Sequence, residues 1–134
     1  MAFVLDASTV LAWAIEDERT PPAMSALAAL RADDEARVPA VWWSEVRNAL
    51  VVNEQRGRLG EADVADFLRG LNRLPISIDR SPDETALFAL ARRHRLTVYD
   101  AAYLELARRE GLPLASLDGD LRAASASGVP LLGG

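Results

Sequence analysis

Short apolar runs alternate along the chain with longer segments of helical periodicity, and this alternation limits the possible folds more than any other feature. The segment from Val64 to Leu71, for example, repeats apolar residues at intervals of three and four, which is typical of one helix face. Strands that alternate with helices pair in parallel, with helices on both faces of the sheet. The runs that we expect to form strands are Phe3–Leu5, Ala36–Val38, Ile76–Ile78, Leu114–Ser116 and Val129–Leu131. We therefore predict an α/β fold of three layers, in which helices flank a parallel sheet of about five short strands.

Local signals mark several helix ends. Ser81 is the expected N-cap of one helix, because a proline follows it and Glu84 lies three residues later. We expect another helix over Pro21–Ala32, and Gly57 should end the helix predicted over Trp42–Arg56. The predicted order is a unit of one strand and two helices that occurs three times, followed by a strand, a helix and a final strand.

Composition narrows the possible chemistry. The 134 residues are half apolar and 26% charged, which is the length and balance of a single globular domain, here residues 1–134. The chain has no cysteine, one histidine (His94) and no lysine, so all 15 basic residues are arginine. These counts exclude disulfide scaffolds, thiolate or multi-histidine metal sites, P-loop nucleotide binding and Schiff-base chemistry.

The net charge is −5, and this acidity counts against a nucleic-acid partner unless bound cations offset the acids. The N-terminus has no basic segment, and Asp6 interrupts its apolar run, so a signal peptide is not expected. No apolar run approaches the roughly 18–20 residues of a membrane span. We expect a cytoplasmic protein that has no membrane partner.

Acidic residues recur where strands meet helices. Asp6 follows the first predicted strand and Asp118 the fourth, while Glu45 and Asp100 lie near helix starts. Each aspartate is also a good helix N-cap, and Glu45 suits a first helical turn, so each has a purely structural interpretation. Parallel sheets bind their ligands at the carboxyl ends of the strands, however, and carboxylates crowded there repel one another unless a cation binds. An all-oxygen ligand set favours Mg²⁺ or Mn²⁺, which commonly serve phosphate chemistry.

Four segments of the chain resemble the PIN-domain ribonucleases, and most closely the VapC toxins of bacterial toxin–antitoxin pairs. They are DASTVLAWAIEDE at the N-terminus, SEVRNAL, YDAAYLELA, and LASLDGDLRAA near the C-terminus. The resemblance covers essentially the whole chain in order and spacing. It implies a PIN-like fold, metal-dependent endonucleolytic cleavage of RNA to 5′-phosphate and 3′-hydroxyl ends, and a cognate antitoxin that blocks the site. We also expect a homodimer.

The resemblance also implies roles for individual residues. The family's four acids correspond to Asp6, Glu45, Asp100 and Asp118. The three aspartates would hold one or two Mg²⁺ or Mn²⁺ ions, with Glu45 as a further ligand or as the base that orients water. Ser116 stands where the family often has threonine, and it keeps the hydroxyl. The polar residues that we expect to surround and support these carboxylates are Asn48, Ser116 and Asp120.

Two other functions fit parts of the pattern. A phosphorylation-switched receiver domain has a similar length and an acidic pocket, and its phosphoacceptor would fall near Asp79. Such a domain usually needs a lysine after its last strand, which this chain lacks. The second alternative is a non-catalytic PIN-like binding domain, and the complete set of four acids argues against it.

Some aromatic and charged residues lie outside the acidic pattern. Adjacent Trp42 and Trp43 cannot share one helix face, so one of them is expected to face outward. The outer face of their helix and that of the helix predicted over Ser8–Glu16 would then form an apolar groove for an amphipathic partner helix. Glu105 and Arg109 have the i, i+4 spacing of an exposed ion pair.

Overall fold

The computed structural model describes residues 1–132 and contains a sheet of four parallel strands. The strands are β1 (Ala2–Leu5), β2 (Glu35–Pro39), β3 (Ile76–Asp79) and β4 (Leu114–Ala115). Their order across the sheet is β3-β2-β1-β4, so β1 lies between β2 and β4. This arrangement confirms the predicted α/β class and four of the predicted strands.

The fifth predicted strand, Val129–Leu131, is wrong. Leu131 forms only an isolated parallel bridge to Leu114. The bridge is held by Leu114 N, which donates to Pro130 O at 2.8 Å, and by Leu132 N, which donates to Leu114 O at 2.9 Å. Because proline lacks the N–H group that a continuing ladder needs, the pairing does not extend.

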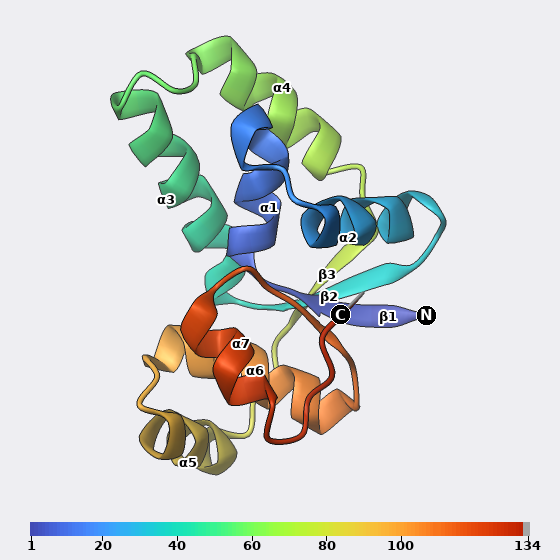
Figure 1. The fold of residues 1–134 in the computed structure, drawn as a ribbon, viewed down its shortest axis with the longest axis vertical. Helices are drawn as coiled ribbons and strands as arrows, with labels where there is room; N and C mark the ends of the chain where they lie inside the picture. The colour runs from blue at the N-terminus through green and yellow to red at the C-terminus, as the bar shows by residue number, and fades with distance from the viewer. Residues whose placement is uncertain (133–134) are drawn as a thin grey trace.

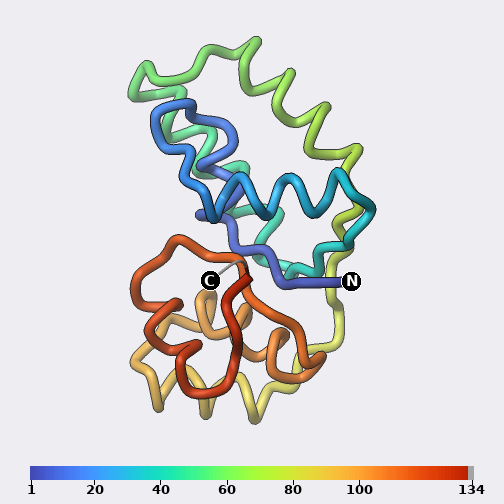
Figure 2. Tube along the Cα trace, turned by 45° about the vertical axis from the view of Figure 1, so that its right-hand side comes forward, coloured from blue at the N-terminus to red at the C-terminus, as the bar shows by residue number. Residues whose placement is uncertain are grey.

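Seven α-helices of the described chain form two layers, one on each face of the sheet (Figure 1). The first layer holds α1 (Ala7–Ala14), α2 (Pro21–Arg31), α3 (Val41–Gln55) and α4 (Glu61–Leu71). The second layer holds α5 (Glu84–His94), α6 (Val98–Glu110) and α7 (Gly119–Ser125). Figure 2 shows that the helices of the first half of the chain cover one face and those of the second half cover the other. None of the helices in residues 1–132 is long and apolar enough to cross a membrane.

Side-chain caps and one glycine explain several helix ends. The N-cap of α5 is Asp83, whose Oδ1 accepts the Ala86 amide at 3.1 Å. The prediction of Ser81 as this cap was therefore wrong by two residues, because the Asp83 carboxylate also places negative charge at the helix N-terminus, where it is favourable. Gly111 closes α6 at φ 64°, a left-handed conformation that glycine adopts without strain.

The core forms where α6 packs against the sheet. Tyr103, Leu104 and Leu106 of α6 are buried in one cluster with Phe3 and Leu5 of β1. Removing this apolar surface from water is the main favourable contribution to folding. It also fixes α6, which begins at the carboxyl end of the strands, against the centre of the sheet.

Glu105 and Arg109 are not the exposed pair that their spacing predicts. Glu105 is only 2% exposed, and its carboxylate accepts Arg109 Nε at 2.7 Å. The same guanidinium donates to the buried carboxylate of Asp79, at the end of β3, at 2.6 Å. Arg37 of β2 lies 3.4 Å from Asp79 as well. This ion network ties α6 to the edge of the sheet, and local spacing could not reveal it because Asp79 lies 30 residues from Arg109.

Arg109→Leu should destabilise the protein strongly. The substitution leaves Glu105 and Asp79 buried without their main counter-charge, and breaking a buried pair in this way costs on the order of 3 kcal/mol. Arg58→Leu is the matched control, because Arg58 pairs with Asp17 at the surface and its loss should change stability little. Thermal unfolding of both variants measures the difference. Equally small shifts would show that the network does not stabilise the fold.

Candidate functional site

The four predicted site acids lie at the carboxyl end of the sheet. Asp6 directly follows β1, and Asp118 follows the neighbouring strand β4. The amide of Asp6 donates to Ala115 O at 2.9 Å, which holds the two strand ends together. Glu45 lies just after the first turn of α3 and Asp100 lies in the first turn of α6, and both helices begin at this end of the sheet, opposite the N-terminal end of β1 (Figure 1).

Asp6 is buried and accepts two hydroxyl groups. Its side chain is 4% exposed, and Ser8 Oγ and Ser116 Oγ both donate to Oδ2, at 2.6 Å and 2.7 Å. Although Asp6 occupies the N-cap position of α1, its side chain caps no amide. Burial raises the pKa of Asp6, the two hydroxyl groups oppose that rise, and the Asp118 charge adds to it. The capping interpretation therefore fails for this residue.

The same two hydroxyl groups hold the loop that carries Asp118. Ser116 Oγ accepts the Asp118 amide at 3.1 Å, and Ser8 Oγ accepts the Leu117 amide at 2.9 Å. Ser116 thus contacts the Asp6 carboxylate, where the sequence analysis placed it. Ser8 was missed, although a hydroxyl residue two positions after a strand-end aspartate is a signal that could have indicated it.

Glu45 is joined to the second layer of helices by Tyr103. The Tyr103 hydroxyl donates to Glu45 Oε1 at 2.6 Å, and the Tyr103 side chain is fully buried. Burial raises the pKa of Glu45, and the charges of the three site aspartates raise it further. The pKa of Tyr103 is raised far above its usual value by burial and by the nearby carboxylates, so its hydroxyl stays protonated and donates. Tyr103 was missed because its spacing on α6 is that of a core residue.

Asp100 and Asp118 differ in what their carboxylates do. The N-cap of α6 is Thr97, whose Oγ1 accepts the Asp100 amide at 3.1 Å, so the Asp100 carboxylate is not needed as a cap. Burial is the main factor that raises the pKa of Asp100, and the charges of Asp118, Asp6 and Asp120 raise it further. Asp118 does cap α7, because its Oδ2 accepts the Leu121 amide at 2.9 Å. The interpretation of Asp118 as a helix N-cap is therefore correct, and it involves one of the two carboxylate oxygens.

Two residues expected to support the acids make no hydrogen bond to them in the described part of the chain. Asn48 lies on α3 and is exposed. Asp120 is exposed in the first turn of α7, where its charge acts on Asp100. Their supporting roles stay predictions.

The donor set of the site fits a hard divalent cation. Every candidate ligand is a carboxylate or hydroxyl oxygen, the chemistry that Mg²⁺ and Mn²⁺ prefer. Within residues 1–132, no arginine lies within 4.0 Å of the carboxylates of Asp6, Glu45, Asp100 or Asp118. In this same part of the chain, no three acidic or histidine side chains converge closely enough to surround one ion.

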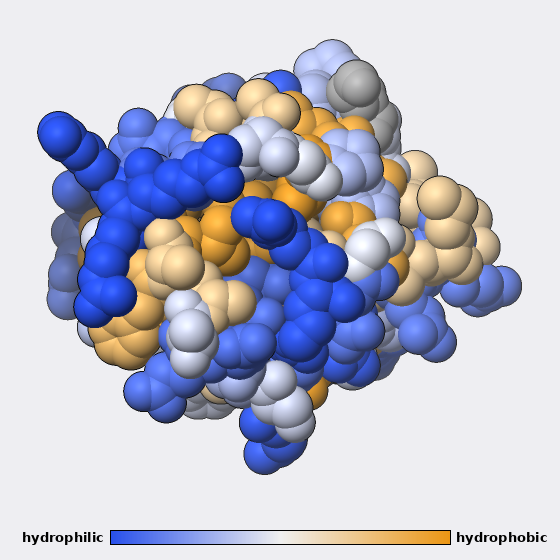
Figure 3. All heavy atoms as spheres, turned by 90° about the horizontal axis from the view of Figure 1, so that it is seen from below, coloured by the Kyte–Doolittle hydropathy of each residue, from blue (hydrophilic) through white to orange (hydrophobic). Residues whose placement is uncertain are grey.

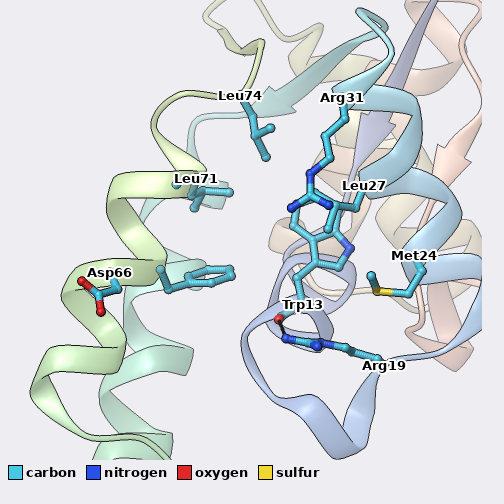
Figure 4. A pocket seen from close by; sticks show the side chains of 10 residues that line it. Trp13, Arg19, Met24, Leu27, Arg31, Asp66, Leu71 and Leu74 are labelled. Carbon is cyan, nitrogen blue, oxygen red and sulfur yellow. Dashed lines mark hydrogen bonds between the residues drawn. The ribbon is translucent and has the colours of Figure 1, made fainter.

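A separate apolar groove lies between α2 and α4 (Figure 4). It has a volume of about 430 Å³, and Trp13 of α1 lies at its centre, with the indole Nε1 donating to Ala23 O at 2.7 Å. Arg19, Arg31 and Asp66 also line it. The apolar side chains around the groove are Met24, Leu27, Phe67, Leu71 and Leu74.

The tryptophan prediction is partly confirmed. Trp42 is 5% exposed and Trp43 is 53% exposed, so one indole does face outward. The Arg47 guanidinium covers the Trp43 ring at 4.4 Å and reaches Asn72, at the end of α4. Helices α1 and α3 pack against each other, and the groove expected along their outer faces stays a prediction.

Glu45→Gln should raise the Tm at neutral pH in the presence of a chelator. The raised pKa of Glu45 means that ionising this carboxyl opposes folding. This penalty is absent below the unfolded-state pKa of about 4.3 and grows as the pH rises through the folded-state pKa. Glutamine keeps the oxygen that accepts the Tyr103 hydroxyl.

The Tm gain should therefore vanish near the unfolded-state pKa and be complete at neutral pH. Thermal melts of the wild type and Glu45→Gln across this range measure it. Glu54→Gln, the same substitution later on the same helix, is the matched control. A Tm difference that stayed constant with pH would contradict the electrostatic explanation.

A protein-family model described as PIN domain matches residues 3–126. Ribonuclease VapC3 of Pyrobaculum aerophilum is 33% identical over 124 residues, which are 90% of this chain and 92% of that protein. The fold is similar to the crystal structure of PAE2754 from Pyrobaculum aerophilum, with a TM-score of 0.73 and 21% identity over 98% of this chain and 90% of that one. It is also similar to Mycobacterium tuberculosis VapC20, described as a sarcin-ricin loop cleaving toxin, with a TM-score of 0.61 and 12% identity over 95% of each chain. The family match covers most of the chain and includes all four acids, and the chain therefore belongs to the PIN domain family.

Proposed function

We propose that the protein is a metal-dependent endoribonuclease that cleaves RNA phosphodiesters, and that it is the toxin of a toxin–antitoxin pair. One observation carries the nuclease proposal: four carboxylates lie at the same edge of the sheet without an arginine partner in residues 1–132. Three of them, Asp6, Glu45 and Asp100, have pKa values raised by burial and by the charges of neighbouring acids, Asp118 among them in each case. The similarity to Ribonuclease VapC3 supports RNA as the substrate.

In this proposal Asp6, Asp100 and Asp118 hold Mg²⁺ or Mn²⁺. A divalent cation supplies charge stabilisation for the phosphate oxygens and makes water a stronger nucleophile at neutral pH. Ser8 and Ser116 orient the Asp6 carboxylate through Oδ2 and make no hydrogen bond to Oδ1.

Glu45 is the proposed general base. Its raised pKa makes it a better proton acceptor than an ordinary carboxylate. The Tyr103 hydroxyl holds Oε1 in place, which leaves Oε2 to take a proton from water that attacks the phosphodiester in line.

The two alternative functions have less support. The receiver-domain alternative needs a free phosphoacceptor near Asp79, but that carboxylate is buried and paired with Arg109 and Arg37. The non-catalytic alternative predicts that the wild-type protein cleaves no RNA even with Mg²⁺ or Mn²⁺, and the next experiment tests it.

Asp6→Asn and Asp100→Asn should each lower RNA cleavage by orders of magnitude while the fold survives. Asparagine keeps the shape of the side chain but loses the charge that would hold a cation. Cleavage of RNA should also stop in EDTA and return on addition of Mg²⁺ or Mn²⁺. Gel-based cleavage assays at matched metal concentration measure all three effects.

Asp83→Asn is the matched control, because Asp83 caps α5 outside the site and asparagine is an equally good cap. It should cleave RNA like the wild type. Full cleavage in excess chelator would rule out the metal mechanism. Wild-type cleavage by both site variants would favour a structural role for the two aspartates.

We further propose that the groove between α2 and α4 binds the antitoxin. An apolar groove of this kind fits the apolar face of an amphipathic helix. Arg19 and Arg31 are among the lining residues, and neither forms an ion pair in the described chain. They would favour a partner helix whose flanks carry acidic residues.

Met24→Glu should weaken antitoxin binding by at least tenfold, because it places a charge in the apolar groove. RNA cleavage by the free protein should not change. Val51→Glu is the control, since Val51 is similarly exposed on α3 but does not line the groove. Isothermal titration with the product of the neighbouring reading frame measures affinity. Equal affinity of both variants would place the partner elsewhere.

A further inference from the structure

An apolar pocket is lined by residues of α3 and α6, the two helices that carry Glu45 and Asp100. It has a volume of about 420 Å³ and lies between the start of α3, the end of β3 and the first turns of α6. Its apolar lining includes Val41, Leu87, Val98 and Tyr99. We call it the Tyr99 pocket.

The pocket and the acidic site share two helices, α3 and α6. Val41 lies one turn before Glu45 on α3, so both project from the same side of that helix. Tyr99 lies one turn before Tyr103, whose hydroxyl binds Glu45, and is the chain neighbour of Asp100. Ligands at the acids and in the pocket would therefore contact neighbouring residues of the same two helices.

The exposure of the lining residues is unusual for apolar side chains. Tyr99 is 60% exposed and Val98 is 45% exposed, both in the first turn of α6. The acids that line the pocket, Asp79 and Glu105, are already paired with Arg109 and do not present free charge. What the pocket offers a ligand is thus an aromatic ring and an aliphatic wall.

One cation completes this surface. Arg80 also lines the pocket, is exposed, and has no ion-pair partner within residues 1–132. An aromatic platform next to a free guanidinium matches a nucleotide of single-stranded RNA, because bases stack on aromatic rings while cations follow the backbone phosphates. Figure 3 shows that apolar surface also lies between hydrophilic side chains on the outside of the α5–α7 layer, but the clefts there are lined by no chain neighbour of the four acids, whereas Tyr99 is the neighbour of Asp100.

We propose that the Tyr99 pocket binds an unpaired base of the RNA substrate next to the cleaved phosphate, with Tyr99 stacking on the base and Arg80 contacting the adjoining phosphate. This inference rests on the proposed ribonuclease function and adds a specificity element to it.

Cleavage kinetics of Tyr99→Ala and Tyr99→Phe on a single-stranded oligoribonucleotide test the proposal. The kcat/KM of Tyr99→Ala should fall by about 10-fold to 100-fold, the typical loss for one stacked base, mainly through KM. Tyr99→Phe keeps the ring and should retain most of the activity. Trp43→Ala is the control, because Trp43 is equally exposed but lies on the α4 side of α3.

Arg80→Gln distinguishes the phosphate contact from the stacking contact. Its affinity for fluorescein-labelled single-stranded RNA, measured by anisotropy in an Asp6→Asn background that binds without cleaving, should depend less steeply on salt than that of the parent. Tyr99→Ala in the same background should bind more weakly at every salt concentration, with the slope unchanged. Thermal melts confirm that each variant folds.

The outcomes separate this inference from the function on which it rests. If the wild type cleaves no RNA, the proposed function fails. If it cleaves but Tyr99→Ala and Trp43→Ala are equally active, the base pocket is wrong. A second copy of the chain is the other possible occupant. A Tyr99→Ala variant that becomes monomeric by sedimentation, while its monomer cleaves like the wild-type monomer, would assign the pocket to a homodimer interface and overturn the base-binding role.

Discussion

Repulsion among four carboxylates at one edge of the sheet is the constraint on which the rest of the site depends. The fold counters it only in part, through hydroxyl groups from Ser8, Ser116 and Tyr103 that donate to Asp6 and Glu45. Hydroxyl donors stabilise a carboxylate but add no positive charge, and the pKa values of Asp6 and Glu45 stay raised. The free energy that this arrangement costs is what a bound cation would recover, which couples metal affinity to the stability of the fold.

The protein also contains a second group of buried acids, and the contrast between the two groups is informative. Asp79 and Glu105 are buried to a similar degree as Asp6, yet both receive the Arg109 guanidinium and Asp79 also receives Arg37. This chain therefore neutralises buried acids with arginine where they serve only structure. The absence of such a partner around the four site acids of the described chain is a specific property of that edge, and it is the property that a metal site requires.

Sequence reasoning reached the elements and the acids because both depend on local signals. Apolar runs indicated β1 to β4, and the position of Asp6 and Asp118 after strands indicated a common edge. The misses share a different cause, which is that contacts between distant segments leave no local signal. Tyr103 and Glu45 lie 58 residues apart, so the tyrosine looked like core alone. The spacing of Glu105 and Arg109 correctly predicted that they pair, but it could not show that the pair is buried, because the burial depends on the distant Asp79. The strand predicted over Val129–Leu131 failed because hydropathy takes no account of the N–H group that proline lacks.

Helix α6 connects the stability of the fold to the geometry of the site. Near its start it supplies Asp100 to the acids and the Tyr103 hydroxyl to Glu45. One to two turns later, Glu105 and Arg109 fasten the same helix to Asp79 at the end of β3. A rigid helix transmits a displacement along its length, so the position of Asp100 relative to Asp6 depends on an ion network that touches neither residue. The buried ion network therefore helps to position the site acids. The free energy that desolvating its charges costs is offset by the stability that the network gives to both the fold and the geometry of the site.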